Sequence, residues 1–140
     1  MDPVRRVLVL FCVAVALAGL ISGCQVSSHD EERAAFDETI HDVEHQFAAF
    51  YLLGSDATSA DIRSFVEKLS LEWKDVERAA EGLDGIDIAD AAAAHQDLID
   101  AVEALPENAE AGEPMRIAMS LFETFKAEVE QVHESGGFHD

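Results

Sequence analysis

The sequence is poor in several residue types, and each shortage excludes a class of function. Lys and Arg number 9 against 29 Asp and Glu, which gives a formal net charge of −20. A surface this negative repels phosphate backbones, so nucleic-acid binding is excluded, whereas a basic protein partner is permitted. The sequence also lacks a Gly-rich phosphate loop and a strand–turn–helix serine elbow. We therefore expect no catalytic activity.

Cysteine is scarce as well, and the second of the two, Cys24, ends a distinctive N-terminal segment. Arg5 and Arg6 precede an unbroken apolar run over residues 7–18, which is shorter than the roughly 20 residues of a transmembrane helix. The order of a basic head, a short apolar segment and small residues predicts a secretory signal. Its ending, Ile21-Ser22-Gly23-Cys24, resembles the lipobox of bacterial lipoproteins. The resemblance implies cleavage before Cys24 and acylation of that cysteine.

This resemblance carries further expectations about location. Residues 1–23 would be a signal peptide, and Cys24 would attach the protein to a membrane through two or three acyl chains, enough for stable anchoring. With Cys24 acylated and Cys12 removed, no thiol is left for a disulfide or a nucleophile. Gln25 in place of Asp after the cysteine favours the periplasmic face of the outer membrane, if the host has two membranes. The alternatives are an uncleaved membrane anchor and a soluble exported protein.

The rest of the chain predicts an all-α fold. After a polar tether over residues 24–33, four apolar stripes at helical spacing follow within residues 34–135, and Gly-rich residues 136–140 form a tail. Short links between helices of similar length favour an antiparallel up-down-up-down four-helix bundle. Five large side chains within the stripes are predicted to be buried: Phe47, Leu69, Trp73, Leu98 and Phe122.

Turn and cap residues mark the limits of these helices. Thr58 or Ser59 is expected to cap the second helix, with Asp61 near its third position. Asp87 is expected to cap the third helix, and Pro114 to be the first residue of the fourth.

Histidines are the candidate functional residues. His95 falls at the centre of the third stripe and His133 at the edge of the fourth, and the predicted topology places His41, His95 and His133 near one end of the bundle. They are therefore candidate ligands of a haem or a metal. The alternative for His95 is a core histidine hydrogen-bonded to the second helix, for example to Glu72. For His133 it is a boundary residue at the negative end of the helix dipole.

His41 and His45 form an i, i+4 pair, the spacing at which two imidazoles chelate one transition-metal ion. Both point away from the apolar stripe of the first helix, so a solvated pair is the competing interpretation. His45 is accordingly a second-tier metal ligand.

The segment Val129-Glu130-Gln131-Val132-His133 resembles the end of the fourth helix in cytochromes c′, but both cysteines that bind haem covalently are replaced by valine. His133 also matches the late histidine of cytochromes b562, which hold non-covalent haem b. The first helix here has no methionine to complete that pair of ligands. We expect a lipid-anchored helical bundle of the cell envelope that binds non-covalent haem or a transition metal at one end. The alternative is a structural or adaptor lipoprotein that binds another envelope protein.

Overall fold

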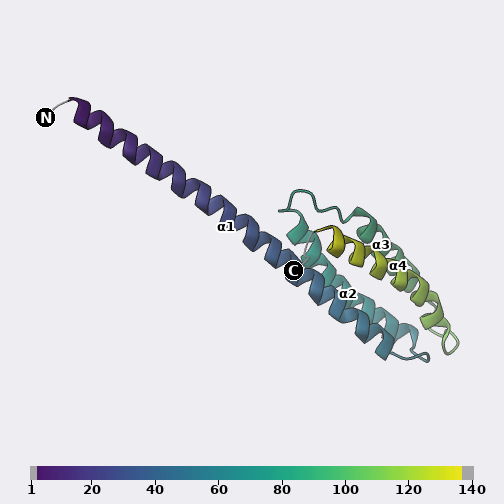
Figure 1. The fold of residues 1–140 in the computed structure, drawn as a ribbon. Helices are drawn as coiled ribbons and strands as arrows, with labels where there is room; N and C mark the ends of the chain where they lie inside the picture. Colours follow the sequence, from purple (N-terminus) through teal and green to yellow (C-terminus); the bar gives the residue numbers. More distant parts are fainter. Residues whose placement is uncertain (1–2, 137–140) are drawn as a thin grey trace. The chain divides into compact units, whose positions relative to one another are not determined.

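The computed structural model describes the backbone of residues 3–136 and the side chains of residues 28–136. It contains the helices α1 (Pro3–Leu52), α2 (Ser59–Ala80), α3 (Ala89–Glu103) and α4 (Glu113–Ser135), and no strand within that range. The chain divides into two compact units, Met1–Ala34 and Ala35–Asp140. The second unit is the all-α four-helix bundle that the sequence predicts (Figure 1).

The first helix is longer than its apolar stripe. It continues from Pro3 through the polar residues 25–30, which contain neither Gly nor Pro and so do not interrupt a helix. It ends where Gly54 adopts a left-handed φ of +83°, the conformation for which a helix C-terminus favours glycine. The signal peptide, the side chain of Cys24 and residues 137–140 of the tail lie outside the part described with side chains.

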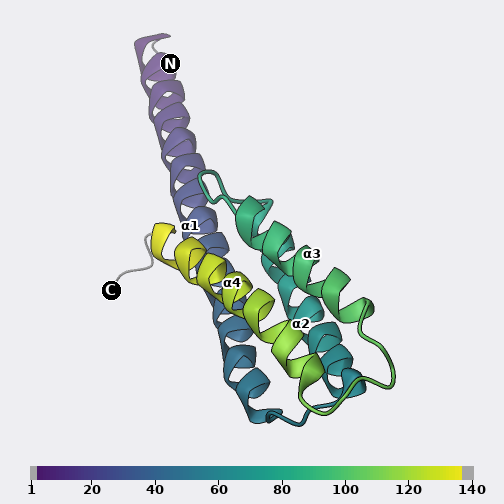
Figure 2. The same cartoon turned by 90° about the vertical axis from the view of Figure 1, so that its right-hand side faces the viewer.

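Ring contacts and hydrogen bonds show that neighbouring helices run antiparallel. Phe50 stacks on Phe122 with ring centroids 3.9 Å apart, while Phe47, one turn earlier, meets Phe125, one turn later, at 6.1 Å. This reciprocal order requires α1 and α4 to run in opposite directions. Figure 2 shows α4 beside the second half of α1, with α2 and α3 alongside.

The helices α2 and α3 are antiparallel for the same reason. The Ser59 hydroxyl, at the start of α2, donates to the Pro106 carbonyl just after α3, over 2.7 Å. The Arg63 guanidinium donates to the Leu105 carbonyl. Farther along α2, Ser70 lies 3.0 Å from the ring of His95, which comes earlier in α3. The predicted up-down-up-down order is thus confirmed.

The core is an aromatic and aliphatic cluster drawn from all four helices. The five side chains predicted to be buried are each at most 5 % exposed: Phe47, Leu69, Trp73, Leu98 and Phe122. Trp73 packs edge-on against Phe125 at 5.2 Å, and its indole N–H donates to Glu77 over 3.0 Å. Burial of these side chains supplies the main driving force for the fold.

Two of the predicted helix starts need correction, and one is confirmed. Thr58 caps α2 in a reciprocal capping box with Asp61, as expected. The cap of α3 is Ile88, not Asp87; Asp87 lies one residue earlier, although its carboxylate still accepts from the Ala89 N–H over 2.9 Å. The first residue of α4 is Glu113, one before Pro114.

Candidate metal centre

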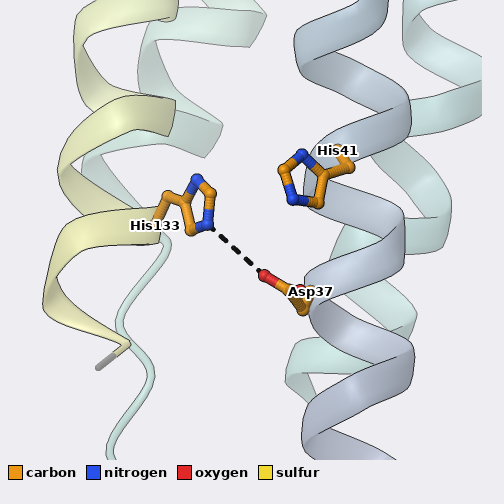
Figure 3. A group of neighbouring side chains, drawn as sticks. All are labelled: Asp37, His41 and His133. Atoms are coloured by element: carbon orange, nitrogen blue, oxygen red, sulfur yellow. Dashed lines mark ion pairs between the residues drawn. The ribbon is translucent and has the colours of Figure 1, made fainter. Parts of the chain in front are cut away.

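Three potential metal ligands meet between α1 and α4. Asp37 and His41 are four residues apart on α1, so they share one face of that helix. His133 reaches toward them from the last turns of α4 (Figure 3). One ligand atom from each of the three residues lies within 4.8 Å of the others. Two imidazoles and a carboxylate are a donor set that binds zinc and other first-row transition metals.

One donor–donor distance within the group matches that of a bound metal. Two donor atoms that bind one tetrahedral zinc at 2.0–2.1 Å lie about 3.3 Å apart by simple geometry. The Oδ1 atom of Asp37 lies 3.3 Å from Nε2 of His133. The rings of His41 and His133 meet edge to face with centroids 5.2 Å apart. All three donors lie within 4.8 Å of one another, so binding one ion requires them to approach further.

The Asp37 carboxylate has an unusual environment. Its Oδ1 atom is buried and accepts no hydrogen bond within the described part of the chain, although His133 lies within ion-pair distance. A buried carboxylate oxygen without a donor is costly, because it has lost its hydration. A cation held between this oxygen and the histidines would remove that cost.

Glu44 completes the surroundings of the two histidines. Its Oε2 atom lies 3.2 Å from Nδ1 of His41, and its Oε1 atom lies 2.9 Å from Nδ1 of His133. Together with Asp37, two carboxylates therefore face the imidazoles. This local negative charge favours a divalent cation.

The site is half open to solvent. The side chains of His133 and Glu44 are 24 % and 25 % exposed, whereas that of His41 is 59 % exposed. The outward direction expected for His41 is confirmed, yet the residue still reaches His133 because both lie along the edge of the α1–α4 interface. A ligand could approach a metal from the side of His41.

His95 belongs to a different part of the bundle. It is 7 % exposed, and its ring packs against Trp73 at 5.8 Å and Phe125 at 5.2 Å. His133 lies eight residues beyond Phe125 on α4, which is about 12 Å along the helix axis. The structure therefore brings His41 and His133 together and separates His95 from them.

A hydrogen bond to α2 satisfies His95, as the core interpretation expects, but the partner is Ser70 and not Glu72. The Ser70 hydroxyl has one proton, which it donates to the Val66 carbonyl over 2.7 Å. The same oxygen must then accept from Nε2 of His95, 3.0 Å away. Burial, followed by the nearby charge of Lys74, lowers the pKa of His95 to about 4. His95 is thus a neutral core residue with Nε2 protonated.

His45 is exposed and lies outside the three-residue group. The i, i+4 partner of His41 at the group is Asp37, on the preceding turn. Asp37 and Glu44 are the residues that the sequence analysis missed. The spacing Asp37-x-x-x-His41 was available as a signal, but it is common on helices whose charged faces are solvated.

Within the described residues, no helix has the length and apolar character needed to cross a bilayer. No family model matches the chain, and no curated protein or solved structure is significantly similar to it. The candidate function therefore depends on the residues of the site alone.

Proposed function

We propose that this chain is a lipid-anchored helical bundle of the cell envelope that binds one divalent transition-metal ion between α1 and α4. The observation that carries the proposal is the convergence of donor atoms from Asp37, His41 and His133 to within 4.8 Å. The buried Oδ1 atom of Asp37, which accepts no hydrogen bond within the described residues, supports it, because a cation would provide a partner for that oxygen. The role is metal carriage, and we propose no catalytic activity.

A metal ion suits the site better than haem does. Both ring nitrogens of His133 face carboxylates, Glu44 at 2.9 Å and Asp37 at 3.3 Å, and these would lie against the macrocycle of an axially bound haem. The other inward histidine, His95, is enclosed by Trp73 and Phe125. A small cation needs no such space, and two of its ligands are already on adjacent turns of α1.

The proposed location depends on the N-terminal segment. The sequence Ile21-Ser22-Gly23-Cys24 behind a short apolar run supports acylation of Cys24 and attachment to a membrane through the lipid. Gln25 supports the periplasmic face of the outer membrane in a host with two membranes. The net charge of −20 would disfavour direct contact with anionic headgroups, so the acyl chains would provide the attachment.

A calorimetric titration of the mature protein in detergent with Zn²⁺ tests the metal site. The wild type should bind one equivalent, and His133→Ala should abolish this binding. His45→Ala is the matched control, because it removes an exposed imidazole from the same helix as His41 and should leave binding unchanged. Binding should also weaken at acidic pH, because protons compete with the metal for the ligand nitrogens. Equal losses of Zn²⁺ affinity in His133→Ala and His45→Ala would contradict the proposal.

An adaptor role is the second candidate, and exposed apolar side chains favour it. Leu71 is 60 % exposed beside a groove between α2 and α3 that Val66, Ile99 and Val102 line. The acidic surface would suit a basic envelope protein as the partner. Crosslinking in intact cells tests this role: Leu71→Glu should remove a crosslinked protein that His133→Ala retains.

A further inference from the structure

Glu44 contacts both histidines of the metal centre. A carboxylate can only accept hydrogen bonds, and its two oxygens lie 3.2 Å and 2.9 Å from Nδ1 of His41 and Nδ1 of His133. An imidazole that donates its Nδ1 proton to Glu44 presents the lone pair of Nε2 to a metal.

On its other side, His133 faces the second carboxylate of the site. Its Nε2 atom lies at an ion-pair distance of 3.3 Å from Oδ1 of Asp37, and that oxygen is buried and accepts no hydrogen bond within the described residues. A divalent cation could take the place of a proton between these two atoms. A metal bound by both Nε2 atoms and by Asp37 would leave Nδ1 of each imidazole to Glu44. Such carboxylate–histidine–metal arrangements orient the imidazoles and raise their basicity.

The number of protein donors in the site determines whether a bound metal keeps an open coordination position. Asp37, His41 and His133 supply three donors, and no other His, Cys, Asp or Glu of the described residues joins the group. Both oxygens of Glu44 are already engaged with the Nδ1 atoms. Zinc sites with three protein ligands keep a fourth position for water or an exogenous ligand. The 59 % exposed side chain of His41 places one side of the site at the surface.

We infer that Glu44 stays outside the coordination shell as a positioning residue, and that the bound metal keeps an exchangeable fourth position that water and small single-donor ligands occupy in turn. This inference rests on the proposed metal function. It distinguishes a site from which an ion can be passed to another molecule from a closed structural site, in which four protein ligands would hold the metal.

Cobalt replaces zinc readily and reports its coordination through visible absorption bands, and azide serves as the probe of the open position. The mature protein in detergent, loaded with one equivalent of Co²⁺ at neutral pH, should show bands of a four-coordinate ion. Titration with sodium azide at constant ionic strength should shift these bands with saturation. Failure to bind Co²⁺ would overturn the proposed function itself. If Co²⁺ binds but its bands do not change with azide, the proposed metal binding stands and the inference of an open coordination position is refuted.

The role of Glu44 has a separate readout. Glu44→Gln should weaken Co²⁺ binding about 10- to 100-fold, as loss of an outer-shell partner does, and the Co²⁺ bands and their azide response should stay the same. Glu38→Gln is the matched control, because it removes the same charge from an exposed position on α1 and should change the affinity little. Bands that change in Glu44→Gln at saturating Co²⁺ would show that Glu44 is itself a ligand and would refute the inference.

Discussion

Replacement of His95 by leucine should make the bundle less sensitive to acid. Burial among Trp73 and Phe125, together with the charge of Lys74, lowers the pKa of this imidazole from 6.5 to about 4. The unfolded chain therefore binds a proton at pH values where the folded chain does not. Proton binding by the unfolded chain therefore lowers the free energy of unfolding as the pH falls from about 6.5 toward 4. Above about pH 6.5 neither state binds this proton, and the stability is retained in full.

The size of the effect follows from the two pKa values. A shift from 6.5 to about 4 makes the wild type lose about 2–3 kcal/mol of unfolding free energy between pH 7 and pH 4.5 through this group alone. Leucine has no proton to bind. It also leaves the Ser70 hydroxyl with its bond to the Val66 carbonyl, so the substitution creates no unbonded donor.

Urea unfolding of the wild type and His95→Leu at both pH values provides the assay. Carboxylates that titrate in this range contribute to both proteins, so the difference between the two pH dependences isolates His95. The variant should lose about 2–3 kcal/mol less than the wild type between pH 7 and pH 4.5. The same loss in both proteins would refute the account of His95 as a neutral core residue.

Three further substitutions, the last with a matched control, test the anchor, the core and a turn. Cys24→Ala should prevent lipid attachment and leave a full-length precursor, and mass spectrometry showing an unmodified Cys24 in the wild type would contradict the anchor. Trp73→Ala should cost about 3–5 kcal/mol in urea unfolding, since it empties a large buried volume; a loss below about 1 kcal/mol would place the ring outside the core. Gly112→Ala should cost at least about 1–2 kcal/mol, because φ is +85° and the new Cβ would lie 3.1 Å from the Ser55 carbonyl oxygen. Gly82→Ala, where that Cβ would meet its nearest atom at 3.9 Å, should change stability little.

Much of the fold could be predicted from the sequence because each helix carries a clear apolar stripe. Phe36, Ile40, Val43, Phe47 and Phe50 repeat at spacings of three and four, and all five are buried. Short polar links then favour antiparallel neighbours. The exact caps were less predictable, as Asp87 and Pro114 show, since several polar residues near a helix start can compete for the same role.

The site was only partly predictable, because the sequence pattern indicates how each helix is rotated about its axis but not how it is shifted along its neighbours. A stripe fixes which face of a helix is buried, so it correctly placed His95 inside and His41 outside. It does not fix how far each helix slides along its neighbour, and His95 therefore lies level with Phe125 and not with His133. Nor does it identify which charged residues at the stripe's edge meet the next helix, which is why Asp37 and Glu44 were missed.

Magnetic resonance of the protein loaded with NMR-active cadmium and with nitrogen-labelled histidine tests the metal centre most directly, because coupling through a metal–ligand bond identifies each bound nitrogen. Cadmium should couple to Nε2 of two imidazoles, those of His41 and His133, with both Nδ1 protons still present. Coupling to His45 or His95, to Nδ1 of either site histidine, or to no histidine at all would contradict this prediction.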